Sequence, residues 1–148
     1  LGLDSIAYKD IARELLSEFD IDDPDPELTV LVETDLDGDG NDEIFFGVER
    51  IADSLMFGTS GDYSLLYMRK VIDGSFTNLL IYGDVENAEY GNGMLNSIRL
   101  SAVADLNGNG RMEVVAGLMY YEGSSTSVIE FNDDKENFTQ VLYVGCNN

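Results

Sequence analysis

Residues 34–47 read TDLDGDGNDEIFFG, and residues 104–117 read ADLNGNGRMEVVAG. In both segments a glycine-rich turn of Asp and Asn residues leads into a hydrophobic stretch that ends in glycine, and the two lie 70 positions apart. A second pair, FTNLLIYG at 76–83 and FTQVLYVG at 138–145, follows in the same order at an offset of 62. Two matched pairs in one order indicate an internal repeat, and repeats of this length are typical of stacked supersecondary units.

The two offsets differ by eight, so the first copy carries an insertion, which we place within Arg50–Tyr63. Each unit then consists of a loop, a strand, a variable connection and a hairpin. We expect a single domain spanning 1–148, a size that suits one hydrophobic core. Within it, 1–27 form an N-terminal helix and an acidic linker, 28–97 the first repeat and 98–148 the second.

Residues 4–19 are predicted to form one amphipathic helix, because apolar residues recur there at spacings of three and four. The members of this apolar stripe are Tyr8, Ile11, Ala12, Leu15, Leu16 and Phe19. Asp4 or Ser5 can cap the start of the helix. The acidic segment 20–27, which contains both prolines of the chain, ends it.

From residue 28 onward, short β-type runs alternate with Gly, Asn and Asp, a pattern typical of antiparallel hairpins and meanders. The predicted strands are Leu28–Glu33, Glu43–Val48, Ser64–Val71, Thr77–Tyr82, Ile98–Ala104, Glu113–Leu118, Ser127–Phe131 and Gln140–Val144. The expected fold class is therefore mainly β, with two antiparallel blade-like β repeats of the propeller-blade type and one N-terminal α-helix.

The composition narrows the classes of partner. The chain has 148 residues, 29 acidic against 8 basic, and a formal charge of −21. Nucleic acid is not expected as a partner, because phosphate binding requires a basic surface, and an anionic membrane face is disfavoured for the same reason. Hydrophobic residues make up 44 % of the chain, which predicts a packed core and not a disordered acidic tail. No apolar run approaches the roughly 18 residues of a membrane-spanning helix, so membrane insertion is not expected.

Histidine is absent, and Cys146 is the single cysteine. These counts remove Ser-His-Asp and Cys-His catalysis, histidine- or cysteine-ligated zinc and an intrachain disulfide. The evident acidic clusters are explained by metal-binding loops, and no spare constellation of catalytic groups remains. We therefore do not expect an enzyme.

The first loop carries alternating carboxylates around glycines that permit a sharp bend. Oxygen donors without nitrogen or sulfur ligands favour Ca²⁺ over Mg²⁺ in an all-protein cage. Converging carboxylates without a cation would repel one another by roughly 4 kcal/mol for each close pair. The predicted carboxylate ligands are Asp35, Asp37, Asp39 and Glu43, with Asn41 contributing its backbone carbonyl.

The second loop is a diluted copy of the first. Asp105 and Glu113 keep the outer positions, Asn107 and Asn109 replace the middle carboxylates, and Arg111 supplies a carbonyl. Two acidic ligands instead of four predict weaker calcium binding, since ligand charge tunes affinity. We expect one Ca²⁺ in the first loop and treat the second loop as either a weaker site or an empty Asn-Gly turn.

An EF-hand is the obvious alternative for such loops. Its twelfth position requires a bidentate Glu, but Phe46 and Ala116 occupy that position here. The segments that follow both loops also have the pattern of strands and not of helices. A helix–loop–helix calcium sensor is therefore rejected.

The two loop segments resemble the calcium loops of FG-GAP/VCBS repeats, the integrin-α-like β-propeller blades, over about residues 28–146. The resemblance implies a blade-forming β-repeat in which Ca²⁺ is held in the loop between adjacent strands. The ligands that it implies are Asp35, Asp37, Asp39, Asn41 and Glu43, then Asp105, Asn107, Asn109, Arg111 and Glu113. The chain departs from the family in holding two repeats instead of a ring of about seven blades. It also departs in the two carboxylates missing from the second loop.

Two blades cannot close a ring, since propellers need at least about four. The chain is then a segment of a longer protein, an assembly unit for other copies, or an open pair of sheets capped by the N-terminal helix. We favour the open pair, because the helix over 4–19 could cover an apolar face or a bare strand edge.

These observations predict a secreted or cell-surface calcium-binding β-repeat module for adhesion or ligand binding, with an extracellular protein or glycan as partner. An alternative is an accessory or catalytic domain acting on extracellular polysaccharide, which requires two carboxylates outside the loops facing each other across a cleft. A third interpretation is a purely structural spacer in a larger surface protein. Tyr63, Tyr90, Tyr120 and Tyr121 are the candidate ligand-contacting aromatics, because they lie in or near loop-rich stretches.

Overall fold

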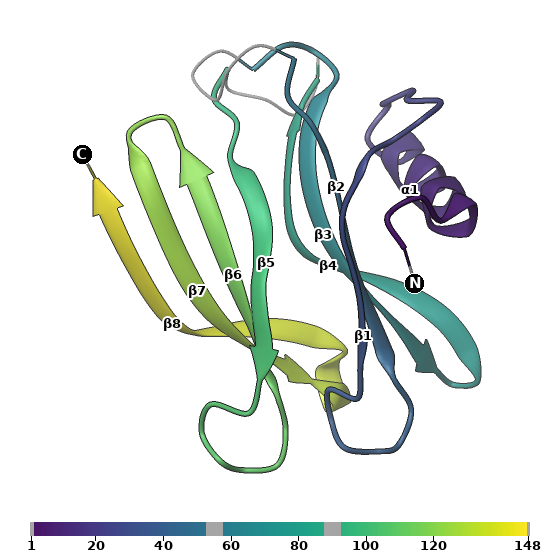
Figure 1. The fold of residues 1–148 in the computed structure, drawn as a ribbon, viewed down its shortest axis with the longest axis vertical. Coiled ribbons are helices and arrows are strands. Elements are labelled where there is room, and N and C mark those ends of the chain that lie inside the picture. Colours follow the sequence, from purple (N-terminus) through teal and green to yellow (C-terminus); the bar gives the residue numbers. More distant parts are fainter. Residues whose placement is uncertain (1, 53–57, 88–92, 148) are drawn as a thin grey trace.

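The computed structural model describes residues 2–52, 58–87 and 93–147, and it consists of one helix followed by two four-stranded antiparallel sheets (Figure 1). The helix is α1 (Ile6–Ser17). The first sheet contains β1 (Leu28–Thr34), β2 (Glu43–Arg50), β3 (Asp62–Ile72) and β4 (Ser75–Glu86). The second sheet contains β5 (Ser97–Ala104), β6 (Glu113–Tyr120), β7 (Gly123–Asn132) and β8 (Asn137–Asn147), with a short 3₁₀ turn, η1 (Asp133–Lys135), before β8.

Both sheets are meanders in which each strand pairs with the next one along the chain. The predicted fold class, mainly β with two antiparallel repeats and one N-terminal helix, is confirmed. Each of the eight predicted strands is present and extends a little further than predicted at one or both ends. The sheets remain separate and open, because each ends in two edge strands.

The strand register explains the unequal repeat offsets. Arg50 pairs with Tyr63, thirteen positions later, whereas the corresponding Tyr120 pairs with Gly123, only three positions later. The first copy therefore gains ten residues between its second and third strands, inside the predicted segment 50–63. The β3–β4 turn, in contrast, is two residues shorter than the β7–β8 turn. The net difference is the eight residues by which the offsets differ; residues 53–57 of the insertion lie outside the described part.

The repeats stack front to back, with the first sheet in the middle of three layers. One face of the first sheet carries Phe46 and Val48 and packs against α1. Its opposite face carries Phe45 and packs against the second sheet. The second sheet presents Ala116, the repeat equivalent of Phe46, toward the first. The same side of each repeat therefore faces the layer that precedes it in the chain, which is α1 for the first sheet and the first sheet for the second.

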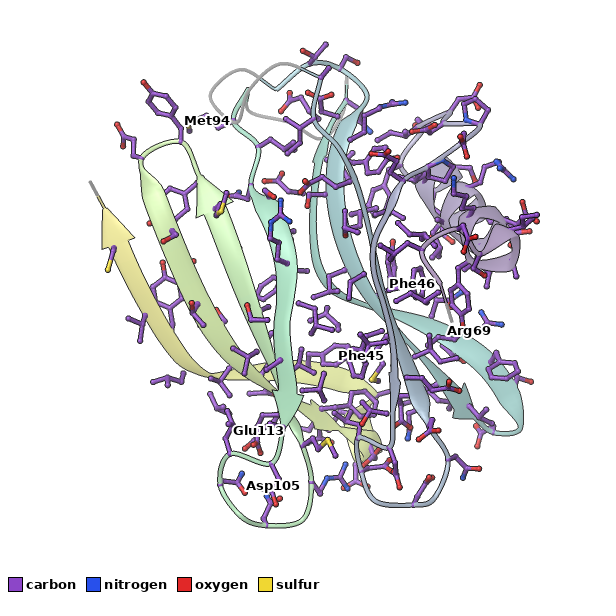
Figure 2. The ribbon with its side chains drawn as sticks, in the orientation of Figure 1. Phe45, Phe46, Arg69, Met94, Asp105 and Glu113 are labelled. Atoms are coloured by element: carbon purple, nitrogen blue, oxygen red, sulfur yellow. The ribbon has the colours of Figure 1, made fainter. Side chains whose placement is uncertain are left out.

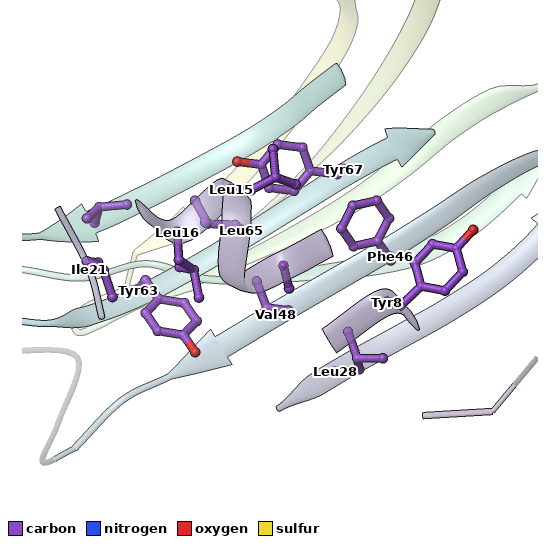
Figure 3. Packing of buried hydrophobic residues seen from close by; sticks show 12 residues of the cluster. Tyr8, Leu15, Leu16, Ile21, Leu28, Phe46, Val48, Tyr63, Leu65 and Tyr67 are labelled. Atoms are coloured by element: carbon purple, nitrogen blue, oxygen red, sulfur yellow. The ribbon is translucent and has the colours of Figure 1, made fainter. Parts of the chain in front are cut away.

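Helix α1 closes the front of the stack. Its buried residues Tyr8, Ala12 and Leu16 lie over the first sheet, and the Tyr8 ring meets Phe46 edge-on at 5.4 Å (Figure 3). The helix is shorter than the predicted 4–19, and its N-cap Ser5 makes no side-chain capping hydrogen bond. Within the described residues, no helix is both long and apolar enough to cross a membrane.

Candidate metal centre

Two equivalent loops, residues 35–42 and 105–112, connect the first and second strands of their sheets and lie at the same end of the molecule (Figure 1). They also lie side by side, because the Met112 backbone N–H donates to the Leu36 carbonyl at 2.8 Å. The side chains of Leu36 and Met112 both belong to the core between the sheets. The stacking of the repeats therefore brings the two predicted calcium loops together, which the sequence pattern did not reveal.

The first loop is organised around the Asp35 carboxylate. This group accepts the backbone N–H groups of Gly38, Asp39 and Gly40 at 2.8, 3.1 and 3.0 Å. Gly38 and Gly40 have φ of 77° and 88°, a region in which L side chains are strained, so both turns require glycine. Asp39 in turn accepts the backbone N–H of Asn41 at 2.7 Å.

The second loop repeats this scheme with almost the same distances. Asp105 accepts the backbone N–H groups of Gly108, Asn109 and Gly110 at 2.7, 3.1 and 2.9 Å. The Asn109 side chain accepts the N–H of Arg111 at 2.8 Å. Amide oxygens can thus maintain the loop conformation without the middle carboxylates, so the fold of the loop does not by itself require four acids.

Three of the predicted ligands converge in the first loop. Asp35, Asp37 and Asp39 each offer a carboxylate oxygen, and these oxygens lie within 4.8 Å of one another. The predicted ligand atom of Asn41 is its backbone carbonyl, and its side chain donates to Asp39 at 3.1 Å. Glu43 also stands apart from this trio: it is 2 % exposed and accepts the Leu36 N–H at 2.8 Å. The three aspartates fit a hard cation such as Ca²⁺, because they supply only carboxylate oxygen.

Lys70 of β3 is the residue that sequence reasoning missed. Its ammonium group donates to Asp37 and to Glu43, both at 2.6 Å, and all three side chains are at most 10 % exposed. Burial lowers the pKa of Lys70, but the two carboxylates outweigh it and raise the pKa well above its ordinary value. Burial has the opposite effect on an acid and raises the pKa of Asp37. The hydrogen bond and charge of Lys70 outweigh burial and bring the pKa of Asp37 below 3.8. A protein-borne cation therefore already neutralises part of the first loop.

The second loop balances its charge without a lysine. Asn107 replaces Asp37 and donates its amide N–H directly to Glu113 at 2.7 Å. Glu130 occupies the position in the second repeat that corresponds to Lys70 in the first. It pairs with Thr139, just as Lys70 pairs with Thr77. The Arg111 side chain forms an ion pair with Asp133. Figure 2 labels Asp105 in this loop and Glu113 at the start of β6. An amide donor thus takes the place that a cation holds in the first loop.

Acidic residues also gather outside the loops, where the enzyme alternative would need them. Asp23, Asp25, Glu27 and Glu49, with Arg50 and Ile51, line a cavity of ≈ 430 Å³. The two least exposed of these carboxylates are already engaged. Asp23 accepts from the Tyr63 hydroxyl at 2.7 Å and lies 3.0 Å from Arg50, and Glu49 accepts from Ser64 and Ser97 at 2.9 and 2.6 Å.

The aromatic candidates fare unevenly. Tyr63 is fully buried, and its hydroxyl is bound to Asp23, so it is not a surface ligand contact. Tyr121 is 58 % exposed and keeps its place among the candidates, whereas Tyr90 lies outside the described residues. A second hollow, of ≈ 330 Å³ between β1 and β5, is lined by residues such as Val32 and Leu100. Among the residues that the structure describes, neither hollow has an aromatic side chain in its lining.

Comparison with known proteins adds no relative: no family model matches the chain, and neither a curated protein nor a solved structure matches it significantly. The resemblance to FG-GAP/VCBS repeats consequently stays a prediction based on the two loop segments.

Proposed function

We propose that this chain is a calcium-binding β-repeat module that holds one Ca²⁺ in its first loop and serves adhesion or ligand binding outside the cell. The observation that carries the proposal is the convergence of Asp35, Asp37 and Asp39 within 4.8 Å. In a chain of net charge −21, such a group is electrostatically costly unless a cation joins it. Calcium tolerates the irregular, flexible geometry of a short loop better than magnesium does.

From the contacts of Lys70 we infer that calcium binding at this loop would be an exchange of cations. An ion that recruits Asp37 or Glu43 has to compete with an ammonium group held at 2.6 Å from each. That competition reduces the affinity relative to a loop with four free carboxylates. We therefore expect the site to be weak, since ligand charge and rigidity set calcium affinity. A site of that strength fills outside the cell, which supports a secreted or cell-surface location.

The second loop is assigned a structural role. In the first loop Lys70 bridges two carboxylates, Asp37 and Glu43. In the second loop the equivalent pair is Asn107 and Glu113, which bond directly to each other and need no cation between them. Only Asp105 and Glu113 remain as acidic residues among the predicted ligands of this loop, against four in the first loop. We expect this loop to stay folded without metal and to bind calcium much more weakly than the first.

Thermal unfolding in EDTA, in CaCl₂ and in MgCl₂ tests the proposal. At a hundredfold excess of Ca²⁺ over its dissociation constant, one site stabilises the folded state by about 2.7 kcal/mol, which corresponds to several degrees in Tm. We expect this rise with calcium, a smaller one with magnesium, and its loss in Asp39→Asn. Asp42→Asn is the matched control, because it removes one charge from an exposed position of the same loop outside the aspartate trio. An equal Tm in EDTA and in calcium would contradict the proposal.

A further inference from the structure

Within the described part of the chain, β8 is an edge strand of the second sheet. In the strand order of that sheet it is bonded to β7 on one side only. Its beginning lies near the first sheet, since Gln140 accepts from the Tyr82 hydroxyl at 2.8 Å. Its C-terminal half extends away from the first sheet at the outer margin of the molecule (Figure 1). Four consecutive apolar residues there, Val141 to Val144, are 48–58 % exposed.

The composition of this edge is unusual for the chain. Residues 137–147, NFTQVLYVGCN, contain no charged residue, although charged residues make up 25 % of the whole sequence. Natural edge strands are normally protected against pairing by charges, prolines or bulges. The equivalent edge strand of the first sheet, β4, carries Asp84 and Glu86 at its C-terminal end. Within the described residues, the device of this kind on β8 is a bulge at Val141, because Val128 pairs with Leu142 and Ile129 with Gln140; from Leu142 onward β8 pairs with β7 in regular register.

From these observations we propose that β8 is a self-association edge, at which the β8 strands of two copies of this chain pair antiparallel across a twofold axis. Pairing satisfies the free backbone N–H and C=O groups of both edges and joins the two second sheets into one continuous sheet. The same operation places the exposed apolar side chains of Val141–Val144 beside their counterparts as cross-strand neighbours.

A second copy is favoured over other occupants by symmetry and charge. A twofold contact brings a strand against itself, and an uncharged strand is one that does not repel its own copy. Elsewhere the surface carries the net charge of −21, which opposes close approach of two copies through any other face. Each copy contributes one β8 edge, so the contact closes at a dimer. The interaction does not involve the loops and is independent of calcium.

Sedimentation of the full chain over a range of concentrations, at low and at high NaCl, tests this proposal. We expect monomer at low salt and a concentration-dependent dimer at high salt, because salt screens the repulsion between the acidic bodies. Val144→Lys, which introduces the natural edge-protecting residue, should raise the dimer dissociation constant by roughly tenfold or more. Because this substitution lowers the net negative charge, its general electrostatic effect would favour association. A weakening therefore reports the edge itself.

Leu80→Lys is the matched control. It places the same charge on β4, the corresponding edge strand of the first sheet, at a residue that is 43 % exposed. Circular dichroism verifies that both variants remain folded. A nitroxide on Cys146, the single and exposed cysteine, gives a second readout, because antiparallel β8 pairing fixes one narrow distance between two labels. A chain that stays monomeric at high salt, a dimer insensitive to Val144→Lys, or open-ended polymers would each overturn the proposal.

Discussion

Two nearly buried carboxylates, Asp37 and Glu43, share one ammonium group in the first loop. Removing one partner from a buried ionic group costs more than the group itself contributes, since the remaining charges stay desolvated and unpaired. Lys70 is therefore a residue on which the metal-free loop depends. A bound cation can take over the same neutralising role.

The first prediction follows for Lys70→Met. In EDTA, the free energy of unfolding should fall by about 3 kcal/mol, because Asp37 and Glu43 lose the cation to which both are hydrogen-bonded. In calcium, the variant should regain more stability than the parent protein gains, because Ca²⁺ no longer competes with an ammonium group. Urea unfolding in EDTA and in CaCl₂ measures both effects. Lys135→Met, at an exposed lysine, is the control, and a variant with no greater response to calcium than the parent would contradict this role.

The second prediction concerns pH. The folded-state pKa of Asp37 lies below its ordinary 3.8, so its contribution to stability is present above that value and is lost as the pH falls through the folded pKa. The folded-state pKa of Lys70 lies above its ordinary 10.5, so its contribution is complete below that value and is lost as the pH rises through the folded pKa. Urea unfolding of the metal-free protein should therefore show a loss of stability below about pH 4. That acid loss should be smaller in Lys70→Met, and an unchanged acid limb would show that other carboxylates account for it.

At the scale of strands and loops, the repeat made much of the fold predictable. The Asp- and Asn-rich turns and the hydrophobic runs beside them predict all eight strands, and the three-and-four spacing of apolar residues predicts the helix. The strand ends were harder, because polar residues such as Asp84 and Glu86 continue β4 beyond its apolar run. The Lys70 contact could not be read from local pattern at all. It depends on the register that sets Ile44 against Arg69 and so brings the end of β3 over the loop.

The third prediction tests whether the two loops use interchangeable ways of balancing charge. Asn107→Asp replaces the amide donor to Glu113 by a second carboxylate and should destabilise the metal-free protein by about 1–3 kcal/mol. Adding Glu130→Lys supplies a lysine at the register position of Lys70 and should restore much of that loss. The coupling energy in a double-mutant cycle should reach about 1 kcal/mol or more. Asn107→Asp with Glu130→Gln separates loss of a negative charge from gain of a cation, and equal rescue by Gln and Lys would refute the exchange.

At the scale of the whole molecule, the first sheet is the central layer, against which both α1 and the second sheet pack. It contacts α1 through one face and the second sheet through the other, so the protein has two hydrophobic clusters that share the strands of that sheet. The cluster beneath α1 contains Phe46, and the cluster between the sheets contains Phe45 (Figure 2). Adjacent residues of β2 thus report on different interfaces, which provides a way to test them separately.

The fourth prediction uses this pair. Phe45 and Phe46 are both fully buried, so either substitution by Ala should destabilise the protein by about 3–5 kcal/mol in urea unfolding. Native-state hydrogen exchange should separate them, because local openings follow the interface that is weakened. In Phe46→Ala the amides of α1 should lose protection first, since the helix is held by the cluster that contains Phe46. In Phe45→Ala the amides of β5 and β6 should lose protection while those of α1 keep theirs. The same exchange pattern in both variants would mean that the three layers open as one unit, and the front-to-back stack would then be a single cooperative core.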